Sequence, residues 1–94
     1  MIKYYKKYIF EKRCKEILQK IFEHLINNRN RGEENIIYED EIYNRYVKIY
    51  GISHDEFIKK YIKVLREMKR NNPKLSLHGK EVNGKGVFYW SLDN

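Results

Sequence analysis

The stretch SHDEFIKKYIKVLREMKRN, residues 53–71, predicts a helix with two chemically different faces. At about 100° per residue, hydrophobic side chains gather on one face. They are Phe57, Tyr61, Val64, Leu65 and Met68. Four basic side chains share the opposite face: Lys59, Lys63, Arg66 and Arg70. Because like charges along one helix face repel each other, this row gains nothing from its own helix, and binding to a polyanion would relieve the repulsion.

A tight turn joins this helix to a shorter helix before it. The shorter helix is predicted from Asp40 to Tyr50, and Gly51 suits a left-handed residue at its C-terminal end. Its inward side chains are expected to be Ile42, Tyr46, Ile49 and Tyr50. Ser53 and Glu56 match a capping box that starts the next helix. The gap of about three residues between the two helices is typical of a helix-turn-helix.

A β-hairpin is predicted after the cationic helix. Its strands are expected at Lys74–Glu81 and Val87–Leu92, joined by a turn at Val82–Gly86 in which Asn83-Gly84 is a strong two-residue turn signal. That turn would place Leu75 opposite Leu92, Leu77 opposite Trp90 and Gly79 opposite Phe88. A four-residue turn shifts the partners by two and keeps the same inward face: Leu75, Leu77, Phe88, Trp90 and Leu92. Lys80 and Tyr89 would point the other way, with Lys85 at the tip.

The N-terminal third predicts another helix and a segment before it. An apolar stripe with a period of about 3.6 residues predicts a helix from Phe10 to Asn27. Residues 1–9, MIKYYKKYI, interleave lysine with aromatic residues and place their apolar face roughly opposite that stripe. We interpret residues 1–9 as a basic and aromatic arm that contacts nucleic acid or a second copy; the alternative is a segment lying over its own domain. A β-prone patch at Asn35–Tyr38 follows a polar loop.

Length and composition limit the possibilities. The 94 residues are enough for one small domain, which we place at residues 10–94. The formal net charge is +7, with the positive excess in the N-terminal third and on the cationic helix. Such a charge favours polyanionic partners. The residue usage, without alanine or threonine and rich in Ile, Lys, Asn and Tyr, matches an AT-rich genome of viral, plasmid or archaeal type.

Cysteine and hydropathy indicate the compartment. Cys14 is the sole cysteine, so no intrachain disulfide can form, and its position on the apolar stripe predicts a small core residue. A reducing, cytoplasmic location fits, which would be the host cytoplasm if the source is a virus. No apolar run approaches the length of about 18 residues that a membrane span needs, so no membrane partner is expected.

The order of predicted elements gives an α+β fold of three helices and a small antiparallel sheet that ends in a C-terminal hairpin. That order, with the Gly51-Ile52-Ser53 turn and the Asn83-Gly84 hairpin, resembles the winged helix-turn-helix family of DNA-binding domains. The stretch from Ile42-Tyr43-Asn44-Arg45-Tyr46 through Phe57 to the hairpin at residues 79–85 is similar to the C-terminal winged helix of phage and plasmid primase-helicases, although no ATPase motor accompanies it here.

The resemblance implies where duplex DNA would bind. In winged helices the third helix enters the major groove and the hairpin reaches phosphate or the minor groove. It implies these DNA-binding residues: Ser53, His54, Lys59, Lys60, Lys63, Arg66, Arg70, Lys80 and Lys85. Because lysine is a point charge and cannot fork onto a guanine edge as arginine does, we expect strong backbone contact and modest base readout.

Other functions find less support in the sequence. The three histidines, His24, His54 and His78, lie in different elements without metal-ligand spacing, so no metal and no cofactor are expected. No catalytic motif appears, and we do not expect an enzyme. The nine tyrosines leave single-strand binding open. The sequence therefore predicts a transcription regulator that binds double-stranded DNA as a homodimer through residues 1–9 and the first helix. The alternative is a winged helix that docks on another protein in a replication or transcription complex.

Overall fold

The computed structural model of the protein describes residues 2–93, with side chains from residue 6 onward. Helix α1 (Ile2–Asn30) is the longest element, and strand β1 (Ile36–Tyr38) follows it. The second helix comprises α2 (Glu39–Ile42), a π-helical turn (Tyr43–Val47) and a 3-10 turn (Lys48–Tyr50). The third comprises α3 (His54–Glu56), a π-helical turn (Phe57–Tyr61) and α4 (Ile62–Arg70). Strands β2 (Leu75–Val82) and β3 (Lys85–Leu92) form the C-terminal hairpin.

The sheet has the register that the hairpin signal predicts. Its strands run antiparallel in the order β1-β3-β2, so the last strand lies in the middle. Leu75 pairs with Leu92, and Leu77 pairs with Trp90, as expected. The turn needs two consecutive residues with positive φ, and Asn83 and Gly84 supply them at 52° and 79°. The sequence prediction of an α+β fold is therefore confirmed for residues 2–93, and the arrangement is compatible with a winged helix.

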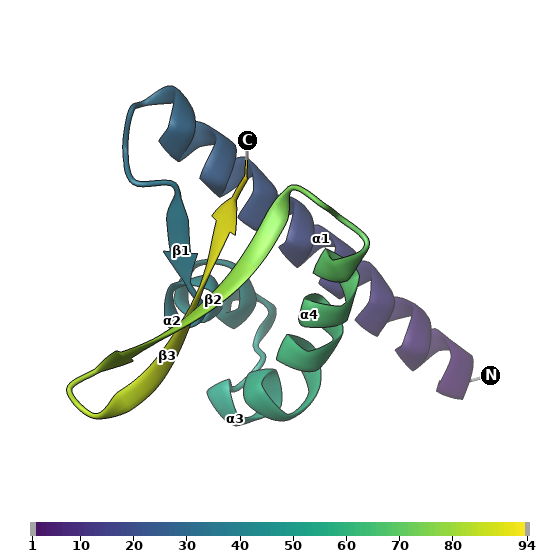
Figure 1. Ribbon diagram of the computed structural model, residues 1–94. Helices are drawn as coiled ribbons and strands as arrows, with labels where there is room; N and C mark the ends of the chain where they lie inside the picture. The colour runs from purple at the N-terminus through teal and green to yellow at the C-terminus, as the bar shows by residue number, and fades with distance from the viewer. Residues whose placement is uncertain (1, 94) are drawn as a thin grey trace.

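The core lies where the three helices meet the inner face of the sheet. Helix α1 runs diagonally behind the sheet, and α4 lies beside the hairpin (Figure 1). The buried side chains come from every layer: Cys14, Ile17, Ile21 and Leu25 of α1; Ile42 and Val47 of the second helix; Phe57, Tyr61, Ile62 and Leu65 of the third; and Ile37, Leu75, Trp90 and Leu92 of the sheet. Cys14 is a core residue as predicted, and burial raises the pKa of its thiol to about 11.

The first helix is longer than the sequence predicts. It begins at Ile2 instead of Phe10 and continues to Asn30 instead of Asn27. No glycine or proline occurs before Gly32, so nothing in the backbone chemistry interrupts the helix where its apolar face changes. From Ile2 on, the predicted arm is thus the first part of α1, which extends past the body of the domain (Figure 1).

In the second helix, one residue that was predicted to lie in the core is exposed instead. Ile49 was expected to point inward, yet it is 76% exposed, while Val47 is fully buried. A π-helical turn at Tyr43–Val47 and a 3-10 turn at Lys48–Tyr50 cause the difference, because they change the angle per residue that an ideal α-helix would keep. No helix in the described chain is both long enough and apolar enough to cross a membrane.

Candidate nucleic-acid interface

The third helix is anchored at its first turn. The Ser53 hydroxyl accepts a hydrogen bond from the Glu56 backbone N–H at 3.1 Å, which confirms the predicted N-cap. The Tyr43 hydroxyl donates a buried hydrogen bond of 2.8 Å to the Ile52 carbonyl, holding the turn between the helices. Phe57, Tyr61 and Leu65 then bury the inward face of the helix. These contacts fix which face of the helix is left to solvent.

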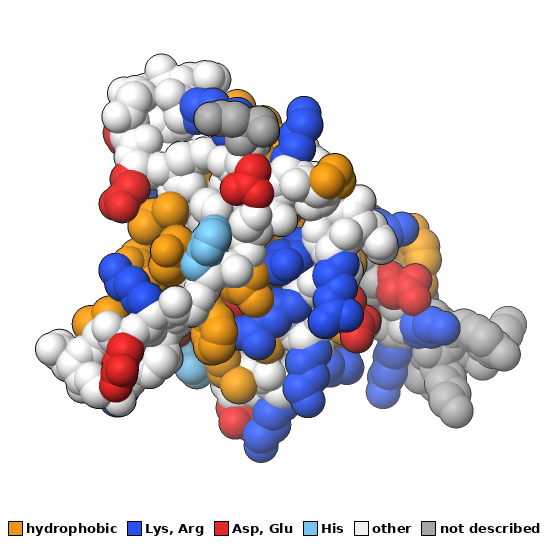
Figure 2. Space-filling model, in the orientation of Figure 1, with side chains coloured by type: hydrophobic (Ala, Val, Ile, Leu, Met, Phe, Trp, Pro, Cys, Tyr) orange, Lys and Arg blue, Asp and Glu red, His pale blue; other side chains and the backbone are white. Residues whose placement is uncertain are grey.

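That outward face carries most of the predicted cationic row. Lys59, Lys63 and Arg70 are exposed, and Lys and Arg side chains gather along this helix in Figure 2. Lys59 pairs with Asp55 one turn earlier, at 3.1 Å, with both side chains exposed. Among the described residues, neither Lys63 nor Arg70 forms an ion pair. Lys60 lies apart from this row, because its amine sits 4.9 Å from the centre of the Phe10 ring of α1.

Arg66 is not a free member of the row. Its Nε donates a hydrogen bond of 3.0 Å to one carboxylate oxygen of Glu39, and Nη2 pairs with the other oxygen. The guanidinium also lies 4.7 Å from the centre of the Phe88 ring. Only 33% of the side chain is exposed. Its charge is matched within the domain, so we leave Arg66 out of the exposed row, and its contact with phosphate stays a prediction.

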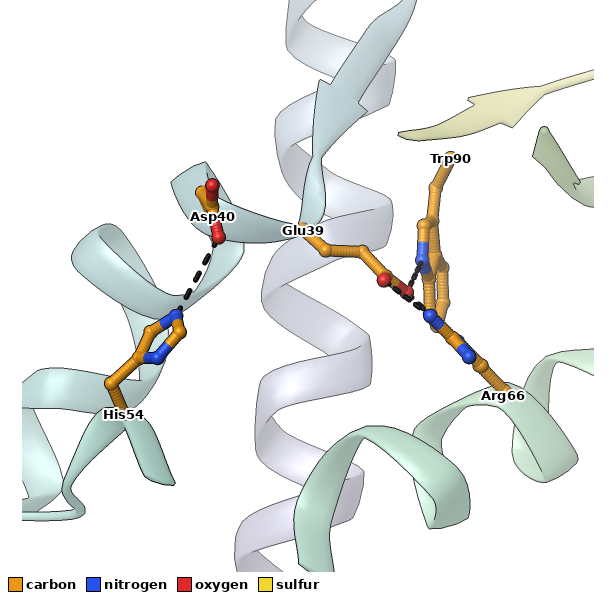
Figure 3. A network of polar contacts seen from close by, with 5 residues as sticks. All are labelled: Glu39, Asp40, His54, Arg66 and Trp90. Carbon is orange, nitrogen blue, oxygen red and sulfur yellow. Dashed lines mark hydrogen bonds and ion pairs between the residues drawn. The ribbon is translucent and has the colours of Figure 1, made fainter. Parts of the chain in front are cut away.

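Glu39 holds the third helix and the hairpin together. Its side chain is 11% exposed, and the oxygen that accepts from Arg66 Nε also accepts from Trp90 Nε1 at 3.0 Å. Figure 3 shows the carboxylate between the guanidinium and the indole. The link joins the start of α2 to α4 and to β3. Sequence reasoning missed Glu39, because nothing local distinguishes it from the two acidic residues that follow it.

The helix N-terminus is occupied by contacts within the domain. Ser53 Oγ serves as the cap, and His54 Nε2 lies 3.6 Å from the Asp40 carboxylate (Figure 3). The His54 ring also packs edge-on against Tyr43, with ring centres 5.0 Å apart. Asp40, Asp55 and Glu56 surround this end of the helix with negative charge. The structure thus does not bring Ser53 and His54 into the exposed cationic row.

The two hairpin lysines lie in different surroundings. Lys85 is exposed at the tip, directly after the two-residue turn. Lys80 lies on the sheet face away from the core, with its amine 5.3 Å from the Tyr38 ring centre and 6.0 Å from that of Tyr89. Interaction with the Tyr38 hydroxyl raises the pKa of Lys80. Lys80 therefore belongs to an aromatic surface and not to the cationic helix face.

A groove of about 440 Å³ separates the third helix from the hairpin. The helix contributes Ile58, Ile62, Lys63 and Arg66, the hairpin contributes Gly86, Val87 and Phe88, and Tyr38, Glu39 and Asp40 also line it. Phe88 was expected to point into the core and is instead 42% exposed, because the groove separates it from the third helix. Ile58, across the groove, is 46% exposed.

Comparison with known proteins gave no match: no family model fits the chain, and no curated protein or solved structure is similar to it. Within residues 2–93 there is also no group of three or more His, Cys, Asp or Glu side chains that could hold a metal ion.

Proposed function

We propose that the protein is a winged-helix transcription regulator that binds double-stranded DNA through the outward face of its third helix. The observation that carries the proposal is the exposed row of Lys59, Lys63 and Arg70 beside a projecting hairpin with Lys85 at its tip. Surface cations on one helix face complement the regularly spaced phosphates of a duplex. The Glu39 link supports the proposal further, since it sets the angle between helix and hairpin that a duplex would meet.

The same geometry predicts how such binding would depend on sequence. Arg66 is the arginine in the middle of the row, from where a guanidinium could donate two hydrogen bonds to the edge of one base. It is paired with Glu39 instead. Contacts to phosphate by lysine would dominate, while Ile58 offers an apolar contact that suits a thymine methyl group. We infer weak discrimination between sequences by one domain. Two domains bound side by side would extend the site, which favours a homodimer.

The experiment that tests duplex binding measures fluorescence anisotropy of a labelled random duplex across a salt series. With about four phosphate contacts, affinity should fall about 100-fold between about 50 and 200 mM salt. Replacing Lys63→Glu and Arg70→Glu together should weaken binding at least about tenfold and flatten the salt dependence. Both side chains are exposed, so the fold should survive.

A matched control separates a binding face from overall charge. Lys15→Glu with Lys20→Glu makes the same change in net charge on exposed positions of α1. This control should bind the duplex nearly as well as the unaltered protein. Equal losses in both double variants would contradict the helix interface, because attraction would then follow net charge alone.

A second candidate function is docking on another protein. The observation that favours it is the groove between helix and hairpin, where Ile58 and Phe88 leave hydrophobic surface exposed on both walls. A partner held by apolar contact would bind with little dependence on salt. If the duplex titration shows no salt dependence and the Lys63 and Arg70 variant behaves normally, docking becomes the better explanation of this surface.

A further inference from the structure

The sheet has a second face that contributes only Lys85, at the hairpin tip, to the proposed duplex interface. Side chains alternate between the two faces of a strand, so Ile37, Leu75 and Trp90 point into the core while their neighbours point out. In register, Tyr38 of β1 pairs with Tyr89 of β3, and Tyr89 pairs with His78 of β2. Three rings therefore form one row across all three strands.

The rings in this row are held in place by contacts with each other. The Tyr38 and Tyr89 rings have centres 5.5 Å apart, and the His78 ring stacks on Tyr89 at 5.0 Å with only 22° between their planes. A hydrogen bond of 2.9 Å between His78 Nε2 and the Ser91 hydroxyl fixes the imidazole further. His78 is exposed, and both tyrosines are half-buried. A ligand that stacks on such pre-ordered rings loses little side-chain entropy on binding.

Positive charge accompanies the rings. Lys80 holds its amine near both tyrosine rings, and Lys85 lies on the same face at the hairpin tip. By strand alternation, the other outward residues of β2 and β3 are uncharged: Ser76, Val82, Val87 and Ser91. The face thus offers flat rings for bases and amines for phosphates.

From this arrangement we propose that the outward face of the sheet binds single-stranded nucleic acid, with bases stacking on the row Tyr38, Tyr89 and His78 and phosphate contacting Lys80. Unpaired bases expose the flat surfaces that aromatic side chains bind, and such stacking is largely independent of sequence. A duplex keeps its bases stacked inside, so it cannot use the rings. The proposal rests on the sheet face and does not depend on duplex binding by the third helix.

Cross-strand aromatic pairs also stabilise sheets, so the test must separate binding from packing. Anisotropy of labelled 12-residue oligo(dT) and oligo(rU) would be measured for Tyr38→Phe and Tyr38→Leu. Phenylalanine keeps the ring and should bind like the unaltered protein, whereas leucine keeps apolar bulk without a ring and should lose about fivefold or more. Neither substitution alters the charge of the protein, so a difference between them reports stacking.

Two further variants complete the design. His78→Ala removes an exposed ring and should also lose about fivefold, which keeps the test valid if Tyr38→Leu proves unstable in thermal unfolding. Phe88→Leu changes an exposed aromatic side chain on the other face of the hairpin and should leave single-strand affinity unaltered.

The outcomes separate this proposal from the duplex proposal. If the protein binds one or both oligomers and the affinity is lower in Tyr38→Leu and His78→Ala, the result supports binding by the sheet face. The comparison of oligo(dT) with oligo(rU) then shows whether the face accepts deoxyribose, ribose or both. Absence of binding, or equal affinity in all the ring variants, overturns it. The Lys63→Glu and Arg70→Glu variant should lose duplex affinity. Adding His78→Ala to that variant should still lower its affinity for single strands, so either proposal can fail alone.

Discussion

Glu39 accepts hydrogen bonds from Arg66 and from Trp90, and its own side chain is nearly buried. Replacing it with alanine would leave a half-buried guanidinium and a buried indole N–H without their acceptor. An unsatisfied group of this kind costs on the order of 1–3 kcal/mol. We expect Glu39→Ala to lower the free energy of unfolding by about 2–3 kcal/mol in urea denaturation.

Glu67→Ala is the matched control for this prediction. Glu67 is an exposed carboxylate on α4, and its removal should change the free energy of unfolding by less than about 0.5 kcal/mol. A Glu39→Ala variant as stable as the control would show that the link between helix and hairpin contributes nothing to the fold.

His24 gives the domain a dependence on pH. Its ring packs between α1 and the second helix, where Nδ1 lies 2.9 Å from the Tyr46 hydroxyl and Nε2 lies 3.8 Å from the Glu41 carboxylate. Burial lowers the pKa of His24 below its ordinary 6.5, although Glu41 acts in the opposite direction. The folded state thus prefers the neutral ring, and the unfolded state takes up the proton more readily.

The sign of the effect follows from that preference. The stabilisation is complete above pH 6.5, the value for the unfolded chain, and is lost as the pH falls through the lower pKa of the folded state. We expect the unaltered protein to lose more stability than His24→Gln between about pH 7.5 and pH 5, measured by urea denaturation. Parallel losses in the two proteins would show that His24 does not titrate differently on folding.

At the scale of elements, local signals account for the parts that the sequence predicts correctly. The Asn83-Gly84 turn sets the hairpin register, and Ser53 sets the start of the third helix. Each depends on backbone chemistry within a few residues, where steric rules leave few alternatives. The burial of Phe57 and Leu65 on one face follows from their spacing alone.

The errors arise where an element depends on distant residues. The prediction that Ile49 points inward is wrong because π-helical and 3-10 turns change the angle between successive side chains. No residue type in the sequence indicates such turns. Arg66 has the spacing of a free surface cation, and only the approach of Glu39, 27 positions earlier, neutralises it. Lys80 points outward with Tyr89, as the strand pattern predicts, but the sequence does not reveal that the aromatic surface under its amine includes Tyr38 of β1. The sequence thus predicts the elements and most of the exposed row, whereas contacts between elements decide which cations remain available.

At the scale of the whole molecule, the net charge of +7 is divided between surfaces of different character. The third helix presents cations spaced along a rod, whereas the outward sheet face combines Lys80 with three rings. Salt should weaken binding to the helix more than binding to the sheet, because stacking does not release counterions.

The projecting end of α1 predicts the oligomeric state. Residues 2–9 continue the helix beyond the body of the domain, and Tyr8 is 63% exposed there (Figure 1). The exposed Tyr8 ring is apolar surface that a second copy could cover, which would favour a dimer through this end of α1. We expect light scattering to give twice the chain mass of 11.6 kDa, and Tyr8→Glu to shift the mass toward a single chain. Tyr8→Phe, which keeps the apolar ring, should remain a dimer. If the unaltered protein has the mass of a single chain at about 100 μM, a dimer with a dissociation constant below that concentration is excluded. Duplex binding would then have to be explained by one domain.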